Sequence, residues 1–253
     1  KEQLPVSLKS LLLIYQQEKN WTKAIDVAEK LRDVLPNFDM HVTLAQLYCE
    51  EACVSLGNGR VSEASRLLSR AERIDNNCVR ASILLGNIAR DQRRYKQAIA
   101  CYKRVAERNP KFLYQVMPSL IACYNKLSDD SGLITFLRDI LTTTSQVCVV
   151  LAVAEHLQAK SGKGDALEFI TDQLKVNPSL MILRYLIALY YSNTHGKIHE
   201  QLSMLLQIID TLLEKRHTFR CASCGFSGRQ HYWLCPGCQT WSSIQPLHGL
   251  EGI

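Results

Sequence analysis

The sequence predicts an all-α fold, a solenoid of helical hairpins that ends in a small β-hairpin metal-binding knuckle. Three observations predict it. Small residues and prolines recur at a spacing of 34 residues or its double, apolar residues follow helical faces, and four cysteines form two C-x-x-C pairs in the last quarter of the chain. We assign residues 1–216 to the helical array and residues 217–253 to the knuckle. With 47% apolar and 21% charged residues, the 253-residue chain is able to bury a hydrophobic core.

The repeat period is set by alanines and prolines. Ala64 and Ala98 are 34 residues apart, and Ala98 and Ala166 are 68 apart. Pro110 and Pro178 are also 68 apart, which is twice 34. A period of 34 residues is the length of one unit of two antiparallel helices. The chain before the cysteines is therefore predicted to be an array of such units.

The first unit has the apolar, small and closing positions of the repeat. They are Leu8, Leu11, Tyr15, Trp21, Ala24, Ala28, Leu31 and Pro36. The spacing from Ala24 to Ala64 is 40 rather than 34. We therefore expect the helix that holds Leu44, Leu47 and Tyr48 to begin about one turn early.

The third unit, residues 82–110, fits the pattern best. Gly86 and Ala98 are small, as expected where the two helices of a hairpin cross, and Pro110 stops the second helix. Larger side chains fill the layers on either side, namely Tyr95, Tyr102 and Val105. Residues 154–178 repeat the scheme, whereas residues 120–137 lack the small positions and residues 180–209 keep only an apolar face. We expect these last two segments to be degenerate repeats or plain helical hairpins.

Over residues 5–212 the chain resembles tetratricopeptide repeats. Such arrays have no catalytic pocket by default and present an extended concave surface to another protein. In the third unit, the residues expected to face that surface and bind a partner are Arg80, Ile83, Asn87 and Arg90. The alternative is that these side chains are ordinary solvated helix surface.

The third unit is also the most basic stretch of a chain whose formal net charge is +6. Its basic residues are Arg90, Arg93, Arg94, Lys96, Lys103, Arg104, Arg108 and Lys111. One interpretation is that these residues form an ordinary solvent-exposed helix face. The other is a patch that attracts phosphate-rich partners or an anionic membrane leaflet.

The four cysteines of the knuckle have the spacing of a tetrahedral metal site. Cys221 and Cys224 form one pair, and Cys235 and Cys238 form the second after ten intervening residues. Glycine follows the first pair and Pro-Gly lies inside the second, so each turn is able to direct two sulfurs at one ion. Four thiolates suit Zn²⁺ and a single rubredoxin-type iron about equally, so the sequence predicts one metal ion and leaves its identity open.

Cysteine usage favours a metal over two disulfides. Six further cysteines lie scattered without paired spacing, which is typical of reduced, buried thiols. They are Cys49, Cys53, Cys78, Cys101, Cys123 and Cys148. His231, between the pairs, is an alternative ligand to one cysteine. His195 and His199 stand four apart, but Gly196 occupies the place where a zinc protease needs its glutamate, which argues against a hydrolase.

The tail resembles rubredoxin-like metal knuckles. In its combination of repeats followed directly by such a knuckle, the chain resembles the lipopolysaccharide assembly protein B family of Gram-negative bacteria. Residues 11–17, 21–31 and 235–250 carry this resemblance, which covers essentially the whole chain. It implies that the metal ligands are Cys221, Cys224, Cys235 and Cys238. It also implies an inner-membrane protein whose N-terminal transmembrane helix is absent here, with this fragment facing the cytoplasm.

The resemblance further implies a non-enzymatic adaptor that regulates lipopolysaccharide synthesis. Such an adaptor promotes degradation of the zinc deacetylase that commits lipid A synthesis, by acting with the membrane-bound ATP-dependent protease. Other lipopolysaccharide synthesis or transport proteins are expected partners, and a homodimer is a further expectation. Because Lys1 is not an initiator methionine, we expect that an N-terminal part has been removed. We also expect the knuckle to dock through its aromatic residues on the helical segment 202–213.

Two other functions remain as alternatives. Zinc ribbons often bind nucleic acid, but Arg220 and Arg229 are the only Lys or Arg of the knuckle, too few to follow a phosphate backbone. A rubredoxin-like electron carrier fused to a scaffold is the second alternative. The spacing between the cysteine pairs is shorter than in a complete rubredoxin, which favours a structural metal.

Overall fold

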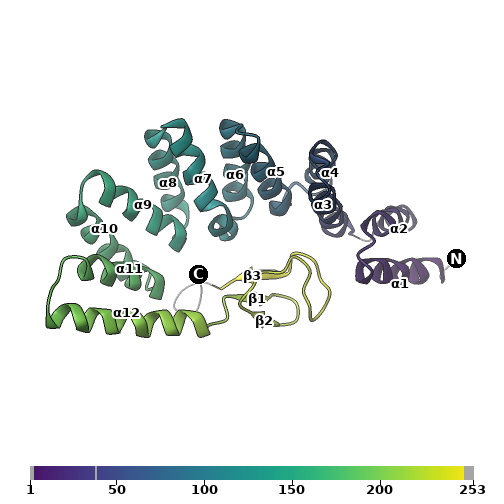
Figure 1. Ribbon diagram of the computed structural model, residues 1–253. Helices are drawn as coiled ribbons and strands as arrows, with labels where there is room; N and C mark the ends of the chain where they lie inside the picture. The colour runs from purple at the N-terminus through teal and green to yellow at the C-terminus, as the bar shows by residue number, and fades with distance from the viewer. Residues whose placement is uncertain (1–2, 38, 248–253) are drawn as a thin grey trace. The chain divides into compact units, whose positions relative to one another are not determined.

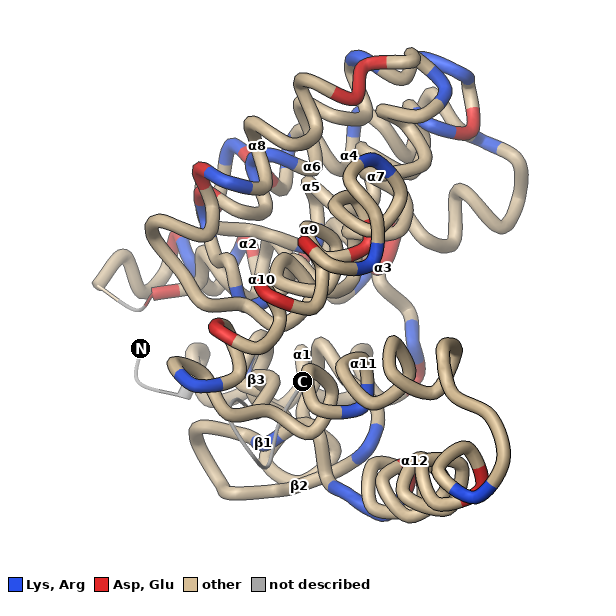
Figure 2. Tube along the Cα trace, turned by 90° about the vertical axis from the view of Figure 1, so that its left-hand side faces the viewer, with Lys and Arg blue, Asp and Glu red and all other residues tan. Residues whose placement is uncertain are grey.

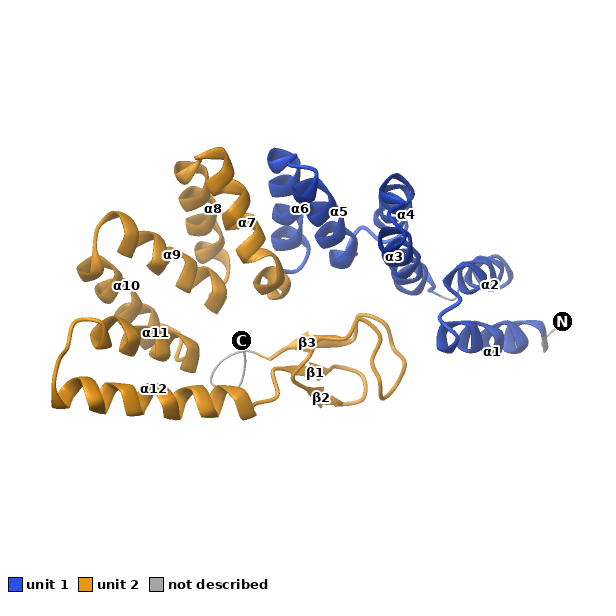
Figure 3. Cartoon of the chain, in the orientation of Figure 1, with its two compact units in different colours: residues 1–109 blue, residues 110–253 orange. Residues whose placement is uncertain are grey.

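The computed structural model describes residues 3–37 and 39–247 (Figure 1). Within these residues the chain forms twelve α-helices, one 3-10 helix and three short β-strands. It divides into two compact units, Lys1–Asn109 and Pro110–Ile253, which we call unit 1 and unit 2 (Figure 3). Unit 1 is helical, and unit 2 combines helices with the three-stranded sheet of the knuckle.

Unit 1 consists of three helical hairpins. They are α1 (Gln3–Gln17) with α2 (Trp21–Val34), α3 (His41–Gly57) with α4 (Val61–Ile74), and α5 (Val79–Asp91) with α6 (Tyr95–Arg108). A residue with positive φ lies in the turn of each hairpin: Lys19 (φ 55°), Gly59 (φ 73°) and Arg93 (φ 59°). This left-handed step lets a helix end and reverse within a few residues. The predicted array of two-helix units is therefore present.

The alanines that define the sequence period mark where paired helices cross. Ala24, Ala64 and Ala98 are each the fourth residue of their helix, and each is 0% exposed. The irregular spacing of 40 arises partly because α3 has 17 residues whereas α5 has 13. The extra four residues are about one helical turn, as the sequence predicts.

The hairpin of α5 and α6 shows why the third unit needs its glycine. A Cβ atom at Gly86 would overlap the ring of Tyr102, which is 0% exposed. The Tyr102 hydroxyl donates a hydrogen bond to Asn87 Oδ1 at 2.8 Å. Helix α6 ends at Arg108, two residues before Pro110, which has no N–H to continue the helical ladder. Glycine and proline thus set the packing and the end of this unit.

Unit 2 begins with the 3-10 helix η1 (Pro110–Phe112) and continues through six helices. They are α7 (Leu113–Leu127), α8 (Asp130–Thr143), α9 (Val147–Lys160), α10 (Lys163–Val176), α11 (Leu180–Tyr191) and α12 (Lys197–Lys215). Their hydrophobic core includes Val147, Val150, Ala154, Ile170 and Ile182. The segments expected to be degenerate repeats or plain hairpins form complete helices here, because an apolar face is sufficient to pair two helices without a small residue at the crossing.

A three-stranded antiparallel sheet with the order β2-β1-β3 forms the knuckle. The strands are β1 (Phe219–Cys221), β2 (Ser227–Gly228) and β3 (Ile244–Pro246). Arg220 on β1 pairs with Ser227 on one side and with Gln245 on the other. The sheet belongs to the same compact unit as α7–α12, and the division at residues 216 and 217 stays a prediction. Residues 248–253 of the predicted knuckle lie outside the described residues.

Across residues 3–37 and 39–247, no helix has both the length and the apolar character that crossing a lipid bilayer requires.

Candidate metal centre

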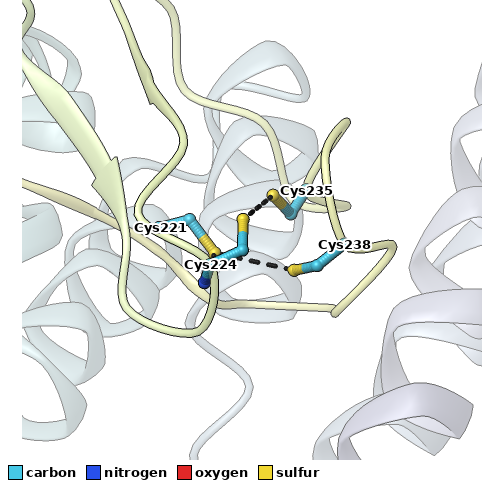
Figure 4. Close-up of side chains that lie close together, drawn as sticks. All are labelled: Cys221, Cys224, Cys235 and Cys238. Atoms are coloured by element: carbon cyan, nitrogen blue, oxygen red, sulfur yellow. Dashed lines mark hydrogen bonds between the residues drawn. The ribbon is translucent and has the colours of Figure 1, made fainter.

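Two loops bring the four cysteine sulfurs of the knuckle together (Figure 4). Cys221 ends β1 and Cys224 follows in the next turn, whereas Cys235 and Cys238 lie in the loop closed by the bridge between residues 234 and 241. All four sulfurs lie within 4.8 Å of one another. The sulfurs of Cys221 and Cys238 are 3.7 Å apart, and those of Cys224 and Cys235 are 3.6 Å apart. The predicted metal-ligating residues are thus one spatial cluster.

Local backbone chemistry explains why each C-x-x-C turn directs its sulfurs inward. In the first turn, Gly225 has φ +76° and donates its N–H to the Cys221 carbonyl at 3.0 Å. In the second, the backbone N–H of Gln239 donates to the Cys235 carbonyl at 3.0 Å. A Cβ atom at Gly237 would lie 3.3 Å from Cys224 Sγ, so this glycine keeps the opposite loop close to the cluster. The glycines expected from the sequence have these two distinct roles.

The sulfur positions fit a tetrahedral ion. Four sulfurs at about 2.3 Å from one Zn²⁺ would be about 3.8 Å apart, which matches the observed separations. A disulfide needs about 2.05 Å, so the four cysteines are thiols rather than two disulfides. His231 is not part of the cluster, since its Nε2 lies 3.2 Å from the Ile244 carbonyl oxygen. These four residues would hold the metal; zinc and iron both suit them.

The surroundings shift the pKa values of two thiols in opposite directions. Cys221 Sγ lies 3.3 Å from Ser243 Oγ and 3.5 Å from the backbone nitrogen of Cys224, and these hydrogen bonds lower the pKa of Cys221 to about 5. At Cys224 the backbone N–H of Phe226 favours the thiolate. Desolvation and the neighbouring cysteines outweigh that effect and raise the pKa of Cys224 to about 12. A cation is needed for all four crowded sulfurs to be thiolates together.

The knuckle packs on η1 and the start of α7 within unit 2. The Phe112 ring stacks on Trp233 with centroids 5.4 Å apart, and it meets His231 edge-on at 5.2 Å. Tyr114 and Phe219 have ring centroids 5.9 Å apart. We expected docking on residues 202–213, because that segment is adjacent along the chain; the aromatic contacts of the knuckle with the helices are with η1 and α7. The missed signal was the pair of aromatic residues after Pro110, Phe112 and Tyr114, because aromatic side chains bury large areas and pair with other rings.

A polar contact joins the same two elements. Lys111 of η1 donates from Nζ to Gln245 Oε1 of β3 at 3.0 Å. Phe112 is 4% exposed and Phe219 is 6% exposed, whereas Tyr114, His231 and Trp233 are half-buried around them. The metal cluster is therefore attached to a buried aromatic contact rather than to a free linker.

The four residues predicted to bind a partner lie in different environments. Arg80 and Ile83 are each 8% exposed, and Arg80 Nη1 is 2.8 Å from Glu50 Oε1. Asn87 and Arg90 are half-buried and retain accessible surface. Their role in partner binding stays a prediction. Arg80 and Ile83 are part of the buried interior of unit 1, and Arg80 bonds Gln46 and Glu50 of α3, a contact that sequence spacing did not reveal.

Comparisons with known protein families agree with this architecture. Residues 219–246 match the rubredoxin metal binding domain, and residues 79–112 match the tetratricopeptide repeat. A solved structure of pilF from Pseudomonas aeruginosa is 16% identical and superimposes with a TM-score of 0.44, over 85% of this chain and 92% of that chain.

Curated relatives align over nearly the whole chain. Lipopolysaccharide assembly protein B of Escherichia coli (strain K12) is 29% identical over 98% of this chain, and its counterpart in Haemophilus influenzae is 32% identical over 97%. The chain spans 64% of the length of the first relative and 62% of the second. By its repeats, its knuckle and these alignments, the chain is similar to the proteins named lipopolysaccharide assembly protein B.

Proposed function

We propose that this chain is the repeat and metal-knuckle portion of a non-enzymatic adaptor that restrains lipopolysaccharide synthesis at the cytoplasmic face of the bacterial inner membrane. In this proposal the adaptor presents the deacetylase that commits lipid A synthesis to the membrane-bound ATP-dependent protease. Because the chain spans less than two thirds of its relatives, the activity and partners of the whole protein are part of the proposal.

The observation that carries the proposal is the alignment of 246–248 residues, repeats and knuckle together, with relatives named for lipopolysaccharide assembly. Tetratricopeptide repeats commonly bind other proteins, since each hairpin buries one face on its neighbour and leaves the other accessible. An adaptor needs such surfaces and needs no catalytic group of its own. Other lipopolysaccharide synthesis or transport proteins would use the same surfaces.

The knuckle gives the adaptor a rigid element. A bound metal cross-links the two cysteine loops and so supplies the folding energy that a domain this small lacks. Phe112 and Tyr114 transmit that rigidity to α7 through their contacts with Trp233 and Phe219. The residues of this chain thereby hold a partner-binding surface of unit 2 in a fixed form. Loss of the metal would loosen that surface without removing it.

The test is the half-life of the deacetylase in cells depleted of the full-length protein. We expect depletion to lengthen the half-life and wild-type protein to restore it. Cys221→Ser, which removes one of the four sulfurs, should fail to restore it. Cys148→Ser is the matched control, because Cys148 lies on α9 outside the cluster and should restore the half-life fully. An unchanged half-life on depletion would contradict the adaptor proposal, and equal rescue by Cys221→Ser would contradict the role of the knuckle.

A further inference from the structure

The outer side of α4 and α6 in unit 1 contains two adjoining hollows. The first has a volume of about 520 Å³ and is lined by residues of α4, including Arg66, Arg70 and Arg73. The second has a volume of about 350 Å³ and lies among α4, α5 and α6, with Arg94 and Arg104 in its lining. Ser65 and Ser69 line both hollows, so the two adjoin. We call them together the arginine groove.

The charged side chains of the arginine groove are five arginines and two glutamates. Each glutamate already has a cationic partner: Glu63 Oε2 is 3.1 Å from Arg60 Nη1, and Glu72 Oε1 is 2.6 Å from Arg108 Nη1. Arg60 and Arg108 are themselves outside the lining. The groove therefore keeps an excess of positive charge. Lys and Arg positions are blue along the trace in Figure 2.

Two of the five arginines form ion pairs. Arg70 lies 4.7 Å above the Tyr48 ring and 2.5 Å from Glu29 Oε1, and Arg104 pairs with Glu72 at 3.4 Å. The other three form no ion pair among the described residues. They are Arg66, Arg73 and Arg94, all exposed. Arg73 Nε donates to the Ser69 carbonyl at 3.3 Å, and Arg94 Nη2 donates to Gln92 Oε1. A guanidinium has five N–H donors, so each of the three arginines keeps N–H groups that are able to bind a ligand.

Holding these arginines together works against the stability of the isolated chain. Arg66, Arg70 and Arg73 are at positions i, i+4 and i+7 of α4, so they lie on one helix face. Like charges at such spacing destabilise a helix, and only Arg70 is neutralised by Glu29. Three arginines on one helix face, beside a hollow, are therefore not explained by solvation of that face alone. Arginine rather than lysine throughout the groove matches the planar, bidentate recognition of phosphate oxygens.

We propose that the arginine groove binds phosphate groups, carried either by a lipid headgroup or by a soluble phosphate compound. Arg66 and Arg73 would bind phosphate oxygens in the first hollow, and Arg94 in the second. Ser65 lies between them and offers a hydroxyl donor. This site lies in unit 1, and neither the metal cluster nor the proposed adaptor activity is part of the argument for it.

The test uses the zinc-loaded chain labelled with nitrogen-15. Inorganic phosphate is titrated at constant ionic strength, with chloride as the replaced anion, and backbone amide shifts of α4 and α6 are followed. We expect saturable shifts at residues of the groove, and about tenfold weaker binding in each of Arg66→Gln and Arg73→Gln, as expected for loss of one charge-assisted contact. Arg138→Gln on α8 is the matched control, because it removes one exposed positive charge outside the groove and should leave the affinity unchanged.

A second arm separates the two sources of phosphate. Phosphatidylcholine vesicles with and without phosphatidylglycerol are sedimented with the wild-type chain and the same variants. Binding only to phosphatidylglycerol vesicles, lost in Arg66→Gln, identifies a lipid headgroup; phosphate binding without vesicle binding identifies a soluble ligand. The proposal is overturned if phosphate shifts do not saturate, if chloride produces the same shifts, or if Arg138→Gln weakens binding as much as the groove variants do. Unchanged spectra elsewhere in each variant establish that these exposed substitutions leave the fold intact.

Discussion

Replacing Phe112 by alanine tests the contact that attaches the knuckle to the helices. Phe112 lies in η1, is 4% exposed, and contacts two rings of the knuckle, Trp233 and His231. The methyl group of alanine is too small to reach either ring, so both ring contacts of Phe112 are lost. The substitution should therefore weaken docking while leaving the four cysteines untouched.

The magnitude follows from burial and ring geometry. Truncating a buried phenylalanine to alanine costs about 3–5 kcal/mol, because both transfer energy and packing are lost. The stacked pair at 5.4 Å and the edge-on pair at 5.2 Å each account for about 0.5–1.5 kcal/mol of that loss. A loss of about 3 kcal/mol raises the opening equilibrium of the docked knuckle about 100-fold.

Hydrogen exchange of the zinc-loaded chain measures this opening. We expect about 100-fold faster exchange in β1, β3 and the start of α7, with zinc stoichiometry unchanged. Phe136→Ala is the matched control, because Phe136 is a buried ring of α8, 8% exposed, in the same unit. It should speed exchange in α8 and its neighbours while leaving β1 and β3 near the wild-type rate. An increase below tenfold at β1 and β3 for Phe112→Ala would refute the assignment of docking to this ring.

Removing the metal with a chelator should abolish the protection of backbone amides from hydrogen exchange throughout the knuckle, while the helices of unit 1 keep theirs. The reason is that the metal supplies most of the stability of so small a domain. Retained protection in the knuckle would show that its hydrophobic core is sufficient. Gly86→Ala should lower the free energy of unfolding of unit 1 by about 1–3 kcal/mol, measured by urea titration, because the added Cβ overlaps a buried tyrosine ring. Gly57→Ala is the control: its added Cβ has nothing within 4 Å, so it should be neutral or slightly stabilising. Arg80→Ala should destabilise unit 1 by about 2–4 kcal/mol, because it removes a buried ion pair. Arg90→Ala removes an exposed ion pair and should cost less than about 1 kcal/mol. Equal losses of stability in thermal denaturation would contradict the structural role of Arg80.

The helical hairpins could be predicted from the sequence because their contacts are local. The helices of each hairpin in unit 1 are joined by three-residue turns, so the alanine at the fourth position of the second helix meets its partner within one repeat. The 40-residue spacing correctly indicated a longer α3. The metal cluster was predictable for the same reason, since each C-x-x-C turn positions two sulfurs through hydrogen bonds within four residues.

The position of the knuckle and the burial of Arg80 were not predictable in this way. Trp233 contacts Phe112 across more than a hundred intervening residues, and Lys111 bonds Gln245 at a separation of 134. Arg80 belongs to the face that the repeat pattern assigns to a partner, but Glu50, 30 residues earlier, binds its guanidinium. Periodicity indicates which face of a helix is apolar and does not say which distant element covers the remaining faces.

The sequence by itself determined the two-helix repeat, the four-cysteine cluster and the resemblance to lipopolysaccharide assembly protein B, because each rests on residue types at fixed short spacing. Only the tertiary structure decided that η1 and α7 receive the knuckle, that Arg80 and Ile83 are buried, and that the arginines of α4 lie beside those of α6. The physical reason is that spacing fixes local backbone geometry. Burial and charge clustering instead depend on the free energy of contacts between residues that the chain brings together only when it folds.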